Sequence, residues 1–214
     1  MAIATRRGTG LDGDAGMVED SSAWSSSPDV SEGLDRWRGL MRADMAREMK
    51  DPRWPRALVA VGVVHLAACL VCHALLEPVA RRDPRYPLIW LLEVATILAV
   101  LRLLAGRGWL HRSAAVKLAA KFWTTFLILA FNVVSLNALT GIEDTWYRPA
   151  WGTLSTFFFA SMAWLFTPLF FIPAVWMWAT GMLMALFNPE AYLIYGVSWF
   201  LVLCGVAANL RRAG

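Results

Sequence analysis

The chain has 214 residues, of which 58% are hydrophobic and only 17% are charged. A typical soluble domain is about 45–50% apolar and about 25% charged, and the apolar excess here lies in long uncharged runs after residue 56. This distribution excludes a soluble globular enzyme, a disulfide scaffold and a disordered chain. It predicts an all-α integral membrane helical bundle with about six transmembrane helices. Most basic residues flank apolar runs, so the net charge of +4 indicates membrane topology and headgroup contact rather than nucleic-acid binding.

Residues 1–30 are rich in Gly, Ser and Asp and predict a disordered tail, because such a segment cannot bury enough apolar surface to offset its ordering entropy. Residues 8–13 match the pattern GxGxxG. A phosphate-binding loop of this kind needs a strand before it and a helix after it. Neither is predicted here, so we expect no nucleotide site.

Residues 31–56 predict an amphipathic juxtamembrane helix followed by a linker. Ser31 is a plausible N-cap, and apolar side chains recur after it at the three- and four-residue spacing of one helix face. These are Leu34, Trp37, Leu40, Met41 and Met45. Two placements stay open: the helix lies on the membrane surface, or it docks on the cytoplasmic ends of the bundle.

The transmembrane domain is predicted over residues 57–212. Its six spans are expected at 57–76, 87–105, 118–139, 150–167, 169–187 and 191–210. The fourth and fifth come from 41 uncharged residues between Arg148 and Glu190, with Pro168 and Pro173 near the middle. At 1.5 Å per residue this run is too long for one straight span of a layer about 30 Å thick. The alternative is an interfacial helix over 151–162 followed by one span.

The distribution of Lys and Arg predicts the topology. Sixteen lie before residue 57, between residues 102 and 121, or after residue 210, whereas four lie in the remaining connections. Because Lys and Arg accumulate in cytoplasmic loops, we expect both termini in the cytoplasm, an even number of spans, and insertion in the cytoplasmic (inner) membrane. The expected partners are the lipid bilayer and other membrane-protein subunits.

The first predicted span carries a stripe of titratable or polarisable side chains, formed by His65, Cys69, Cys72 and His73. Residues 69–73 read CxxCH, the c-type haem attachment pattern, but haem attachment needs a segment accessible outside the membrane. Packing against neighbouring helices is therefore the favoured interpretation. A metal or haem site on the same residues is the alternative.

One acidic residue, Glu93, lies well inside a predicted span, and ionisable groups in a bilayer usually face the bundle interior. Counted from the predicted span ends at 1.5 Å per residue, His73, Glu93 and Asn132 fall at one depth on three successive spans. Successive elements usually pack as neighbours. We therefore predict a polar intramembrane cluster of His73, Glu93 and Asn132.

The chain contains no GxSxG, HExxH or Walker motif. We accordingly predict no enzymatic activity, no catalytic residue and no cofactor.

The distal part of the chain carries a family resemblance. Residues 184–189 (MALFNP), 195–197 (YGV) and 209–212 (NLRR) are similar to the multi-span membrane region attached to many planctomycete serine/threonine protein kinases. No kinase catalytic domain accompanies them, so the resemblance implies a stand-alone membrane module and no kinase activity.

The leading functional expectation is a non-enzymatic structural, scaffold or signalling-associated membrane subunit. Two alternatives stay open. One is a metal- or haem-binding membrane protein that uses the stripe on the first span. The other is a small proton- or ion-coupled transporter that uses Glu93.

Overall fold

The computed structural model describes residues 28–75, 85–141 and 144–213, and within these ranges every regular element is a helix. The predicted all-α fold is thus confirmed. Contacts divide the chain into residues 1–36 and a compact unit from residue 37 to residue 214. The tail predicted over 1–30 lies outside the described residues except for 28–30, which form the start of a helix.

The first helix, α1 (Pro28–Glu48), begins three residues before the predicted cap at Ser31. Proline suits a first helical position, because its missing N–H would have no partner there. In the compact unit, Met41 of α1 is buried with Ala115, and Asp44 Oδ2 accepts a hydrogen bond from the Ala115 backbone N–H at 2.9 Å. These contacts favour the docked placement for this half of α1.

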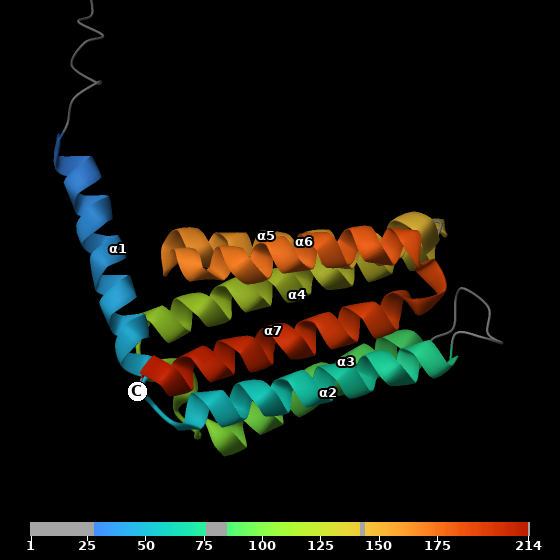
Figure 1. Ribbon diagram of the computed structural model, residues 1–214, viewed down its shortest axis with the longest axis horizontal. Helices are drawn as coiled ribbons and strands as arrows, with labels where there is room; N and C mark the ends of the chain where they lie inside the picture. The colour runs from blue at the N-terminus through green and yellow to red at the C-terminus, as the bar shows by residue number, and fades with distance from the viewer. Residues whose placement is uncertain (1–27, 76–84, 142–143, 214) are drawn as a thin grey trace, which may run out of the picture. The chain divides into compact units, whose positions relative to one another are not determined.

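Six further helices run side by side (Figure 1). They are α2 (Arg53–Leu75), α3 (Arg85–Leu104), α4 (Ala114–Thr140), α5 (Asp144–Leu165), α6 (Phe171–Leu186) and α7 (Ala191–Ala213). Short 3-10 turns lie at Trp109–His111 (η2), Pro168–Phe170 (η3) and Asn188–Glu190 (η4). The turns at Pro168 and Pro189 keep the connections between α5, α6 and α7 short.

Five segments of the described chain are long and apolar enough to cross a membrane. They are Arg53–Leu75, Pro87–Leu104, Ala114–Asn137, Pro168–Leu186 and Asn188–Arg211. The helix predicted over 150–167 is present as α5 but is not among the five, because its first half carries Arg148 and several polar or small residues. Six described helices thus form the bundle, and five of them qualify as spans on length and composition, one fewer than the six spans predicted.

The hairpin of α5 and α6 has the closest backbone approach. A Cβ atom added to Gly152 would lie 2.4 Å from the Gly181 Cα atom, so only glycine fits on α5 at this crossing. Such contacts between small residues are typical of packed membrane helices. Because α5 packs along α6, the structure favours two separate helices over an interfacial helix followed by a single span.

The last helix, α7, packs against both α2 and α6 (Figure 1). Its contact with α2 depends on two glycines. A Cβ atom on Gly196 would lie 2.6 Å from the Cys69 Cβ atom, and one on Gly62 of α2 would lie 3.2 Å from the Phe200 ring. On the two sides of this core, α3 packs against α2, and α4 packs against α5.

Charged side chains tie the ends of the helices together. Asp51 Oδ1 accepts from the Arg53 backbone N–H at 2.9 Å and so caps α2, while its Oδ2 pairs with Arg112 Nη1 at 2.7 Å. On α5, the buried Arg148 donates to the Asn188 carbonyl at 2.5 Å and lies over the Tyr192 ring. The hydrogen bond from Arg148 to Asn188 holds the turn between α6 and α7 against α5.

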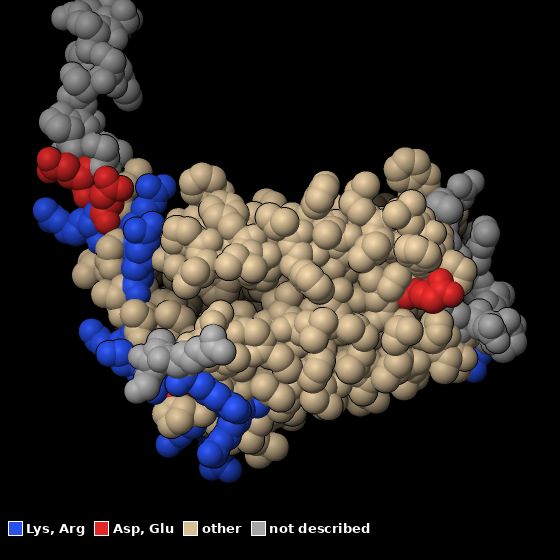
Figure 2. Space-filling view, viewed as in Figure 1, with Lys and Arg blue, Asp and Glu red and all other residues tan. Residues whose placement is uncertain are grey.

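Charge is distributed unevenly over the surface. On the face drawn in Figure 2, Lys and Arg gather at the end of the bundle where α7 ends, and the long middle of this face is free of charged side chains. Many large apolar side chains on this bundle are exposed, among them Leu92, Ile172 and Trp164 at 69%, 70% and 68%. This pattern suits a surface that lies in hydrocarbon rather than in water.

Candidate functional site

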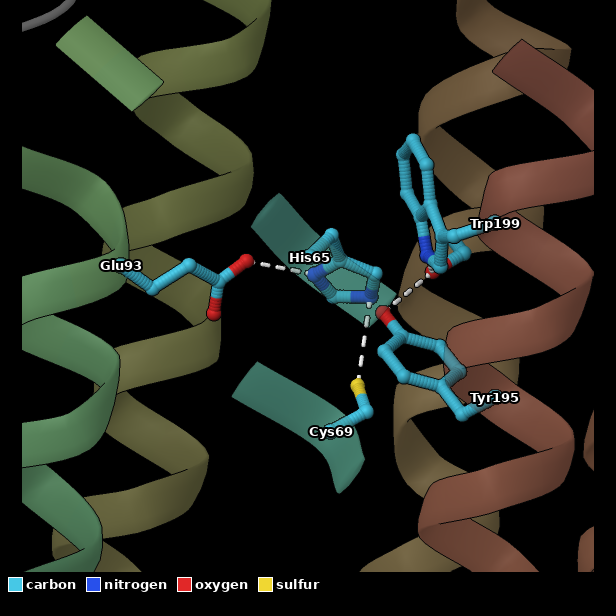
Figure 3. A network of polar contacts seen from close by, with 6 residues as sticks. His65, Cys69, Glu93, Tyr195 and Trp199 are labelled. Carbon is cyan, nitrogen blue, oxygen red and sulfur yellow. Dashed lines mark hydrogen bonds and ion pairs between the residues drawn. The ribbon is translucent and has the colours of Figure 1, made fainter. Parts of the chain in front are cut away.

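A buried polar pair joins α2 to α3. Glu93 is 6% exposed, and its Oε1 lies 2.5 Å from His65 Nδ1. On the opposite side of the imidazole, His65 Nε2 lies 3.6 Å from Cys69 Sγ. Figure 3 shows Glu93 and Cys69 directed at the same ring from two helices. One turn of α2 separates His65 from Cys69, which places both on one face of the helix.

The free-energy cost of burying the pair in an apolar bundle is lowest when its net charge is zero. This allows two arrangements, an imidazolium with a carboxylate or a neutral imidazole with a protonated carboxyl group. In both, His65 Nε2 carries a hydrogen and donates to the Cys69 sulfur. The two arrangements differ only in the position of one proton between Nδ1 and Oε1, so the pair can hold and relay a proton without creating a net charge.

Aromatic rings enclose His65. The Tyr195 and Trp199 rings of α7 meet the imidazole edge-on, with centroids 5.3 and 5.7 Å away (Figure 3). Both also bond to Ser155 of α5: the Tyr195 hydroxyl lies 2.8 Å from Ser155 Oγ, and Trp199 Nε1 donates to the same oxygen at 3.1 Å. Two helices, α5 and α7, thereby fix the wall on which His65 rests.

The Glu93–His65 pair lies on the wall of a cavity of about 310 Å³. The cavity lies between α3 and α4, and side chains of α1, α2, α5, α7 and the turns η2 and η3 also line it. Along α3 it extends from Trp90 to Leu101, which is about 16 Å at 1.5 Å per residue. Apart from this pair and Glu48 of α1, its lining is aliphatic or aromatic, so the cavity suits a largely apolar molecule.

Two indole groups in this wall have unsatisfied donors. Trp90 and Trp151 stack with ring centroids 5.6 Å apart and planes inclined by 18°. They are 9% and 6% exposed, and within the described residues neither Nε1–H has a hydrogen-bond partner. Both nitrogen atoms are buried away from the cavity, and a buried donor without a partner costs roughly 1–3 kcal/mol.

The structure brings only part of the predicted cluster together. Glu93 pairs with His65 instead of His73, whose Nδ1 is buried without a hydrogen-bond partner among the described residues. The Asn132 side chain is exposed on α4. The grouping of His73, Glu93 and Asn132 was therefore wrong in two of its three members.

The error has a physical cause in the helix ends. Helix α2 begins at Arg53 and α3 at Arg85, four and two residues before the predicted spans. Because both helices start earlier than predicted, the residue of α2 that lies level with Glu93 has a lower number than His73. That residue is His65. In addition, α3 and α4 are separated by the cavity, so the assumption that successive spans pack as neighbours fails for Asn132.

The predicted cysteines pack inside the bundle. Cys69 and Cys72 have no exposed surface, and Cys204 is half-buried. In the described part of the chain, no three His, Cys, Asp or Glu side chains lie close enough together to hold a metal ion. Within the stripe of His65, Cys69, Cys72 and His73, the first residue pairs with Glu93 and the two cysteines are buried packing residues.

Sequence reasoning missed the residues that α5 and α7 contribute. Tyr195, Trp199 and Ser155 carry no motif, although Tyr195 and Trp199 are four residues apart and so lie on one helix face. That spacing of two aromatic residues was the available signal. Comparison of the chain with protein-family models, with curated proteins and with solved structures finds no match.

Proposed function

We propose that this protein is a multi-pass membrane protein that binds a lipophilic small molecule in the cavity between α3 and α4. The observation that carries the proposal is the Glu93–His65 pair on the wall of an apolar cavity. The role proposed is binding without catalysis, which is compatible with a sensor or a signalling-associated subunit.

We also propose that both termini lie in the cytoplasm and that α5 crosses the membrane. The support for this orientation is the accumulation of Lys and Arg at the end of the bundle where α7 ends (Figure 2), together with the positive-inside rule. With that orientation the Glu93–His65 pair lies at membrane depth, where a lipophilic molecule would reach it from the bilayer.

A cavity-filling variant tests the proposal. Val94 lines the cavity one residue from Glu93, and Leu92 on the same helix is 69% exposed. Native mass spectrometry of the purified protein in detergent micelles would measure binding of decanol, decylubiquinone and dodecanoate. We expect at least one of them to bind with a stoichiometry of one, Val94→Trp to abolish that binding, and Leu92→Trp to leave it unchanged. Absence of binding by all three probes, or equal binding by both variants, contradicts the proposed function.

A second candidate function is proton-coupled transport, and the Glu93–His65 pair favours it, because one proton can occupy either partner without a net charge. Purified protein in liposomes that hold a pH-sensitive dye would report proton flux under an imposed potential. This candidate predicts flux that is lost in Glu93→Gln and retained in Glu190→Gln, since Glu190 is exposed in the turn before α7. Equal flux from the wild-type protein and Glu93→Gln would rule it out.

A further inference from the structure

The Glu93 carboxyl group presents an unused acceptor to the cavity. Its Oε1 faces His65, whereas Oε2 has no hydrogen-bond partner among the described residues and points away from the imidazole ring (Figure 3). Glu93 is 6% exposed and lines the cavity, and Oε2 is not fully enclosed by protein, so its accessible surface lies in the cavity. In both proton arrangements of the pair the proton lies between Nδ1 and Oε1, so Oε2 only accepts. The cavity therefore favours a head that donates a hydrogen bond or carries a positive charge.

The charges of the lining favour a cation over an anion. Glu93 and Glu48 both line the cavity, and no Lys or Arg of the described chain does. Glu48 is half-buried at the α1 end, where its Oε2 accepts from Trp54 Nε1 at 3.4 Å. Trp54 precedes His65 by about three turns of α2, roughly 16 Å, so the two acids mark opposite ends of the cavity. Because Glu93 is the more buried acid, water and salt screen its attraction for a cation less.

Aromatic rings surround the same end of the cavity as Glu93. The Trp90 ring, one turn before Glu93 on α3, has its centroid 6.2 Å from that of His65. The Tyr195 and Trp199 centroids lie 5.3 and 5.7 Å from it, and all three rings line the cavity. The faces of aromatic rings attract cations, those of Trp most strongly, and several rings together bind quaternary ammonium groups.

A cation can be accommodated without a net charge only if a proton leaves. Added to the neutral Glu93–His65 pair, a monocation would leave one uncompensated charge in apolar surroundings, which is costly. If the proton of the pair passes to water as the cation enters, a neutral imidazole, a carboxylate and the cation remain. The other titratable groups around the pair are Cys69 and Cys72 of α2 and Tyr195 of α7, whereas α4 and α5 contribute only apolar side chains to the cavity wall.

From these observations we propose that the cavity binds a lipophilic monocation, an organic ammonium ion with an apolar tail, in exchange for the proton of the Glu93–His65 pair. The ammonium head lies against Glu93 Oε2 and the neighbouring rings, and the tail extends beside α3 toward Leu101. The inference rests on the proposed function, since it names the ligand class for the same cavity.

The first test compares three probes with similar tails and different heads, on the full chain in non-ionic detergent micelles. Decyltrimethylammonium is permanently cationic, decanol is neutral and dodecanoate is anionic. Native mass spectrometry is expected to show weak binding of decanol and an affinity for decyltrimethylammonium that is higher by at least about 10-fold, as one desolvated cation–π contact provides. If decanol or dodecanoate binds as tightly as the cation, the assignment of a cation is overturned while the proposed function still stands. Absence of binding by every probe contradicts both.

Matched acid variants test the position of the head. Glu93→Gln keeps the shape of the side chain and removes its charge, and it is expected to abolish the preference for decyltrimethylammonium over decanol. Glu190→Gln, at an exposed position in the turn before α7, is expected to keep the full preference. Glu48→Gln should lower the preference by less than Glu93→Gln does. A larger loss in Glu48→Gln than in Glu93→Gln would overturn the placement of the head at Glu93.

A measurement on the unsubstituted protein tests the exchange and covers the case in which a variant does not fold. Isothermal titration calorimetry in two buffers of different ionisation enthalpy counts the protons released on binding. We expect about one proton for each decyltrimethylammonium bound and none for decanol, and an affinity for the cation that rises by up to about 10-fold for each unit of pH. The charge of this probe does not change with pH, so the rise would come from the protein. Tight binding of the cation without release of a proton would overturn the exchange.

Discussion

Gly152 on α5 leaves no room for a side chain against Gly181 on α6, because a Cβ atom built on Gly152 would lie 2.4 Å from the Gly181 Cα atom. The relationship is asymmetric. A Cβ atom on Gly181 would lie 3.4 Å from the Gly152 Cα atom, which is ordinary van der Waals contact. The two glycines therefore differ in how strictly they are required, although they belong to one crossing.

Gly152→Ala is expected to lower the free energy of unfolding by about 1–3 kcal/mol, since overpacking forces the two backbones apart. Gly181→Ala provides the control in the same contact, and it should be neutral or slightly stabilising, because alanine favours the helix by roughly 1 kcal/mol over glycine. Thermal unfolding in detergent micelles, followed by circular dichroism, measures both. Equal destabilisation by the two substitutions would contradict the asymmetry.

Removing one partner of the Glu93–His65 pair is expected to cost more than removing both. Glu93→Leu leaves the imidazole buried without its acceptor, and breaking a buried pair in this way typically costs about 3–5 kcal/mol. In the double variant His65→Leu with Glu93→Leu, an apolar pair replaces the polar one, and most of the stability should return. A double-mutant cycle in denaturant gives the coupling energy, and strictly additive effects would argue against a direct interaction.

Asp51 is expected to stabilise the start of α2 through its cap and its ion pair. Asp51→Ala should lower stability by about 1 kcal/mol, whereas Asp51→Asn keeps a capping oxygen and loses only the charge. Because the pair with Arg112 is about one-quarter exposed on each side, the difference between the two variants should shrink at high salt. Glu32→Ala, at an exposed position of α1, is the control, and stability of Asp51→Ala equal to that of the control would refute the cap.

The orientation proposed for the chain can be checked with reporter fusions. Reporters joined after residues 50, 110 and 214 should all be active in the cytoplasm, and reporters after residues 84 and 145 outside it, because the Lys and Arg of the chain accumulate on one side. The fusion after residue 214 also decides whether α5 crosses the membrane. An external reporter at that position would mean that only five helices span the bilayer.

Long uncharged runs made most helices predictable, since a segment of about 20 apolar residues has few stable forms other than a membrane helix. Helices α2, α3, α4 and α7 begin and end within four residues of their predicted bounds, and Pro168 lies at the predicted division between α5 and α6. The start of α2 at Arg53 was missed, because the residues before 57 were assigned to a linker, although a proline such as Pro55 is tolerated in a first helical turn.

The site was only half predictable. Glu93 and His65 were both candidates as rare ionisable groups in apolar helices, but periodicity does not determine how one helix is rotated and shifted against its neighbour. Residues eight apart, such as His65 and His73, point only about 80° apart around the helix axis, so either could have faced Glu93. The close contact of Gly196 with Cys69, which helps to set the position of α2 against α7, has no signature in a single sequence.

Cys69 and Cys72 are completely buried, whereas Cys204 is half-buried. The rates at which the three thiols react can therefore report how often the bundle opens. A membrane-permeant maleimide should label Cys204 before the two thiols of α2, which could react only after the bundle had opened around them. The delay between the first and the later mass additions therefore measures how often the α2–α7 contact separates in a bilayer, without any added fluorophore. A ligand that tightens the bundle would lengthen that delay, so alkylation kinetics could be used to search for one.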